Sequence, residues 1–360
     1  MARSRASSPP LALALAGLLL GPATAAARDP PLDTIRLPNG VVMPKVAAGT
    51  WPFKGANASA AVQAALSAGY MHVDTAYDYF NQADVGVGLN ASGVARENVF
   101  ITTKVPGCGL RGLGREDCYG NTLKLIEEDL RLLSASGFPT RHLDLLLVHY
   151  PPCMANTNPD LEPPATACGK SRNGCTDPDN CKAIGEQWRA VQAAYARGLV
   201  RAVGVSNYCR ACFACLPQTG VQPMVNQVQL HVGMGPDPQG FASTARARGA
   251  VLVAWGPFGH AAGGGGSSSD ILRGELTSRI AQAHNRSAAQ VALKWIVSRR
   301  AGVVTRSGSE QHLAQDRDIF SWKLTAEELR ALDAASFASA DTPSFLCDDA
   351  PTAPAPELLV

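Results

Sequence analysis

The sequence lacks a sizeable net charge and has no cluster of basic residues. Its 360 residues include 32 Lys and Arg against 30 Asp and Glu, which gives a formal net charge of +2 at pH 7. Proteins that bind nucleic acid carry a basic patch for the phosphate backbone, so the composition gives no argument for such a partner. We expect instead a small molecule that is selected by a pocket.

The sequence also lacks a hydrophobic run long enough to span a membrane. Its most apolar stretch, Leu11 to Leu20, has about ten residues, and a spanning helix needs about 20. This stretch follows Arg3 and Arg5 and precedes small residues at 23–27, which is the layout of a secretory signal peptide. We therefore predict a cleaved signal peptide over residues 1–27, no stable membrane span in the mature chain, and a destination in the secretory pathway, either secreted or in the lumen of the endoplasmic reticulum. An uncleaved anchor, or delivery to an organelle through a bipartite targeting sequence, is the alternative.

Cysteine is abundant, which suits an oxidising compartment. Of the ten cysteines, four lie in one stretch rich in Pro, Asn and Asp: Cys153, Cys168, Cys175 and Cys181. Cys209, Cys212 and Cys215 have a C-x-x-C-x-x-C spacing, but a thiolate metal site needs four ligands and usually two paired clusters. We expect disulfides between surface loops and no metal site, with thiol–disulfide exchange at Cys209 and Cys212 as a weaker alternative. Three Asn-x-Ser sequons agree with the secretory route: Asn57, Asn90 and Asn285.

From about Pro31 onward, short β-branched runs alternate with amphipathic segments, as in repeated βα units. Eight runs are expected to be strands: Lys45–Gly49, Met71–Asp74, Val99–Lys104, Leu143–His149, Ala202–Ser206, Val225–Gln229, Val251–Trp255 and Gly302–Thr305. Helical periodicity is expected over 121–133 and 186–196. The pattern predicts one (β/α)8 barrel, a TIM barrel, over residues 28–345, with a C-terminal tail at 346–360. A doubly wound sheet, the competing fold, would place a G-x-G-x-x-G turn after the first strand, and none is present there.

Two irregular insertions follow predicted strands. One is Cys-rich and runs from Pro151 to about Ala183, and the other runs from Gly259 to Asp270. Because the βα loops of a barrel lie at its C-terminal face, both are expected to overhang the mouth of the active site. The residues after about Ser336 are expected to lie over the surface.

Ionisable side chains stand at or just beyond the ends of predicted strands, where buried parallel strands should be apolar. They form one candidate catalytic set: Asp74, Tyr79, Lys104 and His149. Reducing a carbonyl group with hydride requires a proton donor for the developing alkoxide, and tyrosine, with an ordinary pKa near ~10, needs assistance near neutral pH. An ammonium from Lys104, held by Asp74, would favour the phenolate of Tyr79, and a neutral His149 imidazole would orient the carbonyl. Each residue alone has a structural explanation, such as a helix cap or a core histidine, so the argument depends on the set.

These residues stand in segments that resemble the aldo-keto reductase family. Residues 69–79 (GYMHVDTAYDY) resemble the family signature, with its Asp and Tyr five positions apart. Residues 99–104 (VFITTK) resemble the segment that ends in the catalytic Lys, and residues 143–151 (LDLLLVHYP) the segment that bears the catalytic His. The likeness runs from about residue 37 to residue 335. It implies a barrel enzyme that reduces an aldehyde or ketone, with Tyr79 as the proton donor.

The resemblance also implies a site for NADP(H). It assigns to the cofactor Thr50, Asp74, Ser206, Asn207, Gln227, Trp255, Arg306, Ser307, His312 and Asp316. Ser206, Asn207 and Gln227 match the residues that bind the nicotinamide carboxamide, and Trp255 replaces the usual stacking Tyr with another flat ring. The substrate is expected among Trp51, Tyr79 and His149.

At the adenosine end the sequence departs from the family pattern. Arg306 stands where a Lys is usual, before Ser307, and a guanidinium can grip two phosphate oxygens. His312 replaces a phosphate-binding Arg, and Asp316 replaces an adenine-contacting Asn. One strong contact to a 2′-phosphate is therefore kept and another weakened, which favours NADP over NAD only modestly.

The main functional prediction is an NADP(H)-dependent aldehyde or ketone reductase. The alternative is a nicotinamide-binding subunit that senses redox state or regulates a partner and turns over little. The complete set of four ionisable residues argues against this alternative, because a sensor has no need of Tyr79. We make no prediction of the oligomeric state.

Overall fold

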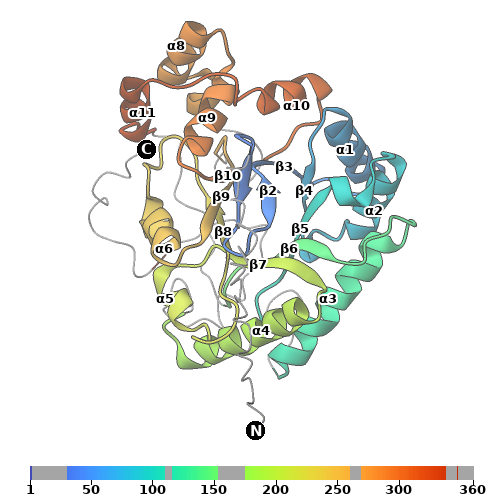
Figure 1. The fold of residues 1–360 in the computed structure, drawn as a ribbon. Helices are drawn as coiled ribbons and strands as arrows, with labels where there is room; N and C mark the ends of the chain where they lie inside the picture. The colour runs from blue at the N-terminus through green and yellow to red at the C-terminus, as the bar shows by residue number, and fades with distance from the viewer. Residues whose placement is uncertain (2–30, 110–115, 153–174, 260–268, 338–346, 348–360) are drawn as a thin grey trace.

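Eight parallel strands close into a barrel with helices around it in the computed structural model (Figure 1). The structure describes residues 1, 31–109, 116–152, 175–259, 269–337 and 347. The barrel strands are β3 (Val46–Gly49), β4 (His72–Asp74), β5 (Phe100–Val105), β6 (Leu143–Val148), β7 (Val200–Ser206), β8 (Val225–Gln229), β9 (Val251–Trp255) and β10 (Gly302–Thr305). Neighbours in the chain are neighbours in the barrel, and β10 pairs with β3 to close it. The predicted (β/α)8 fold is confirmed, and each predicted strand matches a barrel strand to within two residues at either end.

The helices follow the strands around the outside of the barrel. They are α1 (Ala56–Ser67), α2 (Gln82–Ala91), α3 (Cys118–Ser134), α4 (Pro178–Ala196), α5 (Arg210–Ala214), α6 (Phe241–Ala247), α7 (Ser269–Arg273), α8 (Glu275–His284), α9 (Ala288–Val297), α10 (Glu310–Arg317) and α11 (Ala326–Asp333). The short helices η1 (Tyr77–Tyr79), η2 (Arg96–Asn98) and η3 (Pro238–Gly240) lie between them. None of the helices within the described ranges is both long and apolar enough to cross a membrane.

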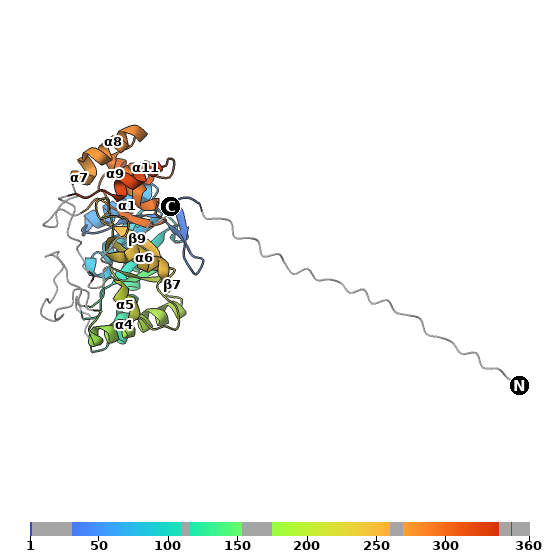
Figure 2. The same ribbon diagram turned by 90° about the vertical axis from the view of Figure 1, so that its left-hand side faces the viewer.

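An antiparallel hairpin, β1 (Thr34–Arg36) and β2 (Val42–Pro44), covers the N-terminal end of the barrel. Asn39 in its turn donates from Nδ2 to the carbonyl oxygen of Arg201 at the start of β7 (2.8 Å). The ring of His72, at the start of β4, is bonded to the Pro44 carbonyl (3.0 Å). Figure 2 shows the hairpin in blue at one end of the barrel. The hairpin therefore leaves only the opposite end of the barrel, where the carboxyl ends of the strands meet, for a site built on the strands.

Strand β6 illustrates how the barrel tolerates charge in its interior. All six residues of β6 are buried, as expected for a parallel strand covered on both faces, yet one of them is Asp144. Its carboxylate accepts from Arg96 Nη2 (2.7 Å), Arg201 Nη1 (2.6 Å) and the backbone N–H of Ile101 (2.9 Å). The buried charge is thus paired and hydrogen-bonded, which is the condition for its stability inside a protein.

Both helices predicted from periodicity are confirmed, but both begin earlier than predicted. The first turn of α3 is capped by Asp117, whose side chain accepts from the backbone N–H of Gly120 (2.8 Å). Asp177 caps α4 by accepting from the N–H groups of residues 179 and 180, and Pro178 occupies the first helical position, where its missing N–H costs nothing. The irregular insertion predicted to reach Ala183 therefore ends at Asp177, because this cap and proline start the helix.

Disulfides are present, as predicted. Four join the cysteines that the structure describes, namely Cys108–Cys118, Cys175–Cys212, Cys181–Cys215 and Cys209–Cys347. Each cysteine of the C-x-x-C-x-x-C run is bonded to a different distant partner, so the alternative of an exchange pair between Cys209 and Cys212 is wrong. No group of three or more potential metal ligands occurs among the described residues.

The predicted C-terminal tail at 346–360 is buried at the one residue of it that the structure describes. Cys347 is only 6% exposed, and its backbone N–H donates to Gln239 Oε1 (2.6 Å). Cys153 and Cys168, the signal peptide at 1–27, and the predicted domain boundaries at residues 28 and 345 lie outside the described residues. The three sequon asparagines are exposed, and their glycosylation stays a prediction.

A buried carboxyl group between α3 and β5 makes the fold sensitive to pH. Asp129 is fully buried, accepts from Thr103 Oγ1 (2.6 Å) and is also bonded to Gln82 Nε2. Burial raises the pKa of Asp129 to about 7, whereas the pKa of an unfolded Asp is about 3.9. Its contribution to stability is therefore complete below pH ~4 and is lost as the pH rises through 7.

Asp129→Asn should make the protein less sensitive to this pH range. An amide can accept from Gln82 Nε2 and donate to Thr103 Oγ1, and it does not ionise. Only the wild type should therefore lose free energy of unfolding, on the order of 2 kcal/mol between pH 5 and pH 8, from this group. Urea unfolding of both proteins at the two pH values measures the difference. An equal loss in both would show that Asp129 does not titrate between them.

Candidate active site

The four ionisable residues predicted as a catalytic set come together at the C-terminal ends of three neighbouring strands. Asp74 is the last residue of β4, Lys104 is the fifth of the six residues of β5, and His149 follows β6 directly. Tyr79 ends the short helix η1, which follows β4. The parallel register of β4, β5 and β6 thus places residues that are distant in sequence at one end of the barrel.

A buried ion pair forms the base of the site. Lys104 Nζ donates to Asp74 Oδ1 (2.5 Å) and to the carbonyl oxygen of Thr75 (2.9 Å). Gln227 Nε2, from β8, donates to Asp74 Oδ2 (2.8 Å). Lys104 and Asp74 are 1% and 3% exposed. The ammonium lies 5.3 Å from the centroid of the Tyr79 ring, so the pair supports the phenol from one side.

The rings of Trp51 and His149 lie next to Tyr79, which is itself partly exposed. Its ring centroid lies 5.2 Å from that of Trp51 and 5.6 Å from that of His149, the second in an edge-to-face arrangement. Burial raises the pKa of Tyr79 well above its usual value, Asp74 and Asp78 raise it further, and Arg306 opposes them. Asp74 pairs with the Lys104 ammonium at contact distance, and the predicted stabilisation of the phenolate by Lys104 stays a prediction. With its pKa raised, Tyr79 is a neutral phenol and has a proton to donate.

A fifth ionisable residue, Asp78, belongs to the site. Its Oδ1 lies 2.8 Å from His149 Nδ1, and its Oδ2 accepts from the hydroxyl of Tyr150 at 2.5 Å. Burial alone would raise the pKa of Asp78, but the charge and hydrogen bond of His149, the hydrogen bond of Tyr150 and the charge of Lys104 lower it below its usual value. Asp78 and Tyr150 are not among the predicted site residues. In the sequence, the signal that could have identified Asp78 is its position directly before Tyr79. In the structure, most of the surrounding segment is buried, so a charged residue there needs a partner.

The residues predicted to bind the nicotinamide carboxamide also lie together. Ser206 Oγ donates to the carbonyl oxygen of Gln227 (2.7 Å), and Asn207 Nδ2 donates to the carbonyl oxygen of His149 (3.1 Å). Trp255 Nε1 donates to Asn207 Oδ1 (2.9 Å). Asn207 has a φ of 60°, a left-handed conformation that asparagine adopts more readily than most residues. These contacts fix the orientation of its amide beside His149.

The loop after β3 connects the catalytic set to the end of β10. Thr50 is buried, and its hydroxyl donates to Thr75 Oγ1 (2.9 Å). Arg306, just after β10, donates from Nη1 to the carbonyl oxygen of Trp51 (3.0 Å). Its guanidinium is thus close enough to Tyr79 to influence the phenol electrostatically.

The remaining residues predicted for the adenosine end lie just before α10 and along it. Ser307 Oγ accepts from the backbone N–H of Ser309 (3.0 Å), and His312 is exposed in the first turn. Asp316 is only 4% exposed, its Oδ2 accepts from Thr305 Oγ1 (2.9 Å), and burial raises its pKa to about 6. The structure therefore brings Arg306 and Ser307 next to the loop after β3 but turns the carboxyl group of Asp316 towards the protein interior.

The chemistry of this donor set fits a nicotinamide dinucleotide. Asn207 and Gln227 carry amides that can both donate and accept, as a carboxamide ligand requires. The Trp255 ring is partly exposed at the end of β9, where a flat ligand ring can stack on it. Arg306 adds an exposed guanidinium, which suits phosphate oxygens.

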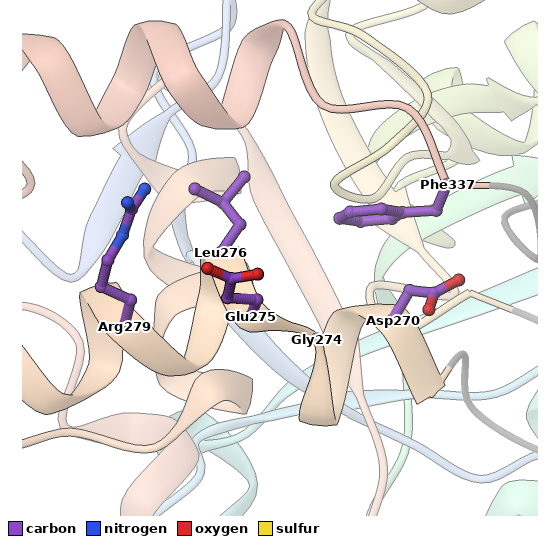
Figure 3. Close-up of a pocket in the computed structure, with 6 residues that line it drawn as sticks. All are labelled: Asp270, Gly274, Glu275, Leu276, Arg279 and Phe337. Atoms are coloured by element: carbon purple, nitrogen blue, oxygen red, sulfur yellow. The ribbon is translucent and has the colours of Figure 1, made fainter.

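A cleft of about 310 Å³ lies elsewhere, between α7, the start of α8 and the segment after α11 (Figure 3). It is lined by Asp270, Gly274, Glu275, Leu276, Arg279 and Phe337. None of these residues belongs to the catalytic set or to the predicted cofactor site. This cleft is therefore not the active site.

A (β/α)8 barrel with this set of residues at the C-terminal ends of its strands defines a class of barrel oxidoreductases that act on small carbonyl compounds. The aldo/keto reductase family profile matches residues 45–336, and the chain belongs to this family. A glyoxal reductase of Bacillus subtilis is 31% identical over 304 residues, which cover 84% of this chain and 92% of the relative. A 9,11-endoperoxide prostaglandin H2 reductase of Trypanosoma cruzi is 30% identical over 303 residues, or 84% and 90% of the two chains.

Solved structures agree with this assignment. An aldo/keto reductase from Brucella melitensis is similar with a TM-score of 0.65 and 29% identity, covering 83% of this chain and 98% of the other. An aldo-keto reductase of Bombyx mori in complex with NADP has a TM-score of 0.66 and 26% identity, covering 83% and 91%. NADP(H) is the cofactor of the family, so the donor set and the family agree.

The buried ion pair should be coupled energetically. Lys104→Met leaves the carboxylate of Asp74 buried without its cation, and we expect the free energy of unfolding to fall by about 3–5 kcal/mol. Adding Asp74→Asn removes the unpaired charge, so the double variant should regain part of that loss, as measured by denaturant unfolding. A double variant whose loss equals the sum of the two single losses would show that the residues are not coupled.

Proposed function

We propose that this protein reduces an aldehyde or ketone to an alcohol, with NADPH as the hydride donor and Tyr79 as the proton donor. The observation that carries this proposal is the neutral phenol of Tyr79 at the C-terminal end of the barrel, beside His149 and above the Lys104–Asp74 pair. Bound at this site, the cofactor supplies the hydride.

The side chains of the protein would handle the oxygen of the substrate. The closeness of the His149 and Tyr79 rings supports binding of the carbonyl oxygen by both side chains, and Trp51 adds an aromatic ring next to the phenol. When hydride adds to the carbonyl carbon, the oxygen takes the proton of the Tyr79 hydroxyl, because an alkoxide is a stronger base than a phenolate. The phenolate formed is next to the Lys104 ammonium and regains a proton from solvent.

Arg306 supports a preference for NADP(H) over NAD(H). Its guanidinium is exposed, and within the described part of the chain only its Nη1 forms a hydrogen bond, to Trp51. The remaining N–H groups can bind the oxygens of a 2′-phosphate in the forked geometry that arginine provides. His312, in the first turn of the neighbouring α10, adds a weaker contact.

We also propose that the protein works in an oxidising compartment of the secretory pathway. Four disulfides among the described cysteines support this location, because reducing compartments disfavour such bonds. The order of basic, apolar and small residues over 1–27 supports it independently.

Tyr79→Phe should lower kcat for reduction of an aromatic aldehyde by about 10²–10⁴-fold, the usual contribution of a general acid. NADPH affinity, followed by Trp fluorescence, should change little, because the hydroxyl is not part of the carboxamide site. Tyr119→Phe on the exposed face of α3 serves as the matched control. Retained turnover in Tyr79→Phe would exclude the proton-donor role, and cofactor binding without turnover of any aldehyde or ketone by the wild type would favour a sensor.

Arg306→Ala should weaken NADPH binding by about 10–100-fold, the effect of losing charge-assisted hydrogen bonds. NADH lacks the 2′-phosphate, so its affinity should change by less than about threefold on the same argument. Fluorescence titrations with both cofactors measure this, and Arg246→Ala on the exposed face of α6 is the control. Equal weakening of both cofactors would remove the argument for NADP(H).

A further inference from the structure

Asp78, His149 and Tyr150 form a closed cluster beside Tyr79. Both oxygens of the Asp78 carboxylate are used, Oδ1 by His149 Nδ1 (2.8 Å) and Oδ2 by the Tyr150 hydroxyl (2.5 Å). The Tyr150 ring also stacks on the His149 ring, with centroids 4.7 Å apart and planes inclined by 25°. The Asp78 side chain is 2% exposed and that of His149 is 12% exposed. The imidazole is thus held through one nitrogen and one face, while its other nitrogen, Nε2, makes no hydrogen bond to any described residue.

The charge state of Asp78 decides which nitrogen of His149 carries a proton. The pKa of Asp78 is below its usual value, so its side chain is a carboxylate and can only accept. Nδ1 must therefore be an N–H. In the neutral ring Nε2 then has a lone pair and no proton. It can donate a hydrogen bond to a carbonyl oxygen only when the ring is an imidazolium.

This constraint changes the role expected for His149. A neutral imidazole that orients the carbonyl by donation would need its proton on Nε2, and the contact with Asp78 excludes that tautomer. We propose that Asp78 is a positioning residue that pairs with a His149 imidazolium, and that this cation donates from Nε2 to the carbonyl oxygen of the substrate. The proposal rests on the reductase function given above.

The other groups around the imidazole leave Asp78 as its dominant charged neighbour. From β4 and η1 come Asp74, Asp78 and Tyr79, from β5 comes Lys104, and Tyr150 follows in the chain. Asp74 and Lys104 neutralise each other at 2.5 Å, and Tyr79 is an uncharged phenol. Asn207, which reaches the His149 carbonyl from β7, is uncharged. The carboxylate of Asp78 therefore faces the imidazolium without a second formal charge in direct contact with it.

The experiment compares the wild type with Asp78→Asn, which keeps the shape of the side chain and removes the charge. Because reduction requires the imidazolium, kcat/KM for an aromatic aldehyde is high at low pH and falls as the ring loses its proton. We expect Asp78→Asn to move this fall to lower pH by about one unit or more, since a contacting opposite charge favours the charged form. At a pH above the wild-type fall, kcat/KM of Asp78→Asn should be at least about tenfold below that of the wild type. At low pH the two values should converge. Asp33→Asn, an exposed carboxylate beside β1 at the opposite end of the barrel, is the matched control.

A second measurement does not depend on activity. NMR of protein with ¹⁵N-labelled histidine, with the His149 signals assigned from a His149→Gln variant, reports the proton on each ring nitrogen across the pH range. We expect a protonated Nδ1 in the neutral ring of the wild type, and a titration that moves to lower pH in Asp78→Asn. Tyr150→Phe keeps the carboxylate and should move the titration less than Asp78→Asn does.

The outcomes separate the cluster from the function. A His149 titration that Asp78→Asn leaves unchanged, or a neutral ring with its proton on Nε2, overturns the proposal. A titration that moves while the pH profile of kcat/KM stays fixed overturns the donation to substrate. A wild type that binds NADPH but reduces no carbonyl compound contradicts the proposed function, and the NMR result then decides the pairing alone.

Discussion

The ion pair between Lys104 and Asp74 is the interaction on which the rest of the site depends. It connects the ends of β4 and β5, and Gln227 extends it to β8 across the barrel. A lysine this deeply buried is tolerated only with a partner and complete hydrogen bonding. The pair therefore fixes the ends of β4, β5 and β8 relative to one another. It also fixes the position of the Lys104 ammonium that contacts the Tyr79 ring.

Two carboxylates precede Tyr79 in the sequence, and each binds its own partners. Asp74 neutralises Lys104 below the phenol, and Asp78 holds His149 and Tyr150 beside it. Because the Lys104 ammonium is paired with Asp74, its charge does not offset the effects that raise the pKa of Tyr79. This separation explains why the phenol stays neutral even though a lysine and a histidine are both near its ring, and it suits the site to donating a proton.

The fold was predictable from the sequence because alternation of buried strands and amphipathic helices is a local pattern. The catalytic four were predictable because the strand ends at Asp74, Lys104 and His149 converge in any parallel barrel. Three other features could not be predicted from the sequence. The pairing of cysteines such as Cys209 and Cys347 depends on three-dimensional proximity, which spacing does not encode. The charge state of Tyr79 depends on whether Lys104 is already paired, and the start of α4 at Pro178 lies in a stretch whose composition is typical of loops.

The disulfide between Cys209 and Cys347 has a topological consequence. It joins residues 138 positions apart, and strands β8, β9 and β10 all lie between them, so the second part of the barrel is one covalent ring. Closing a ring of this length removes conformational entropy from the unfolded chain equivalent to about 5 kcal/mol at 25 °C in the chain-entropy treatment. The bond also begins two residues after Asn207, so the ring is anchored beside the carboxamide site. Reduction of this bond would let the segment that carries β8, β9 and β10 expand further in the unfolded chain, so the redox state of the surroundings bears on the stability of these strands.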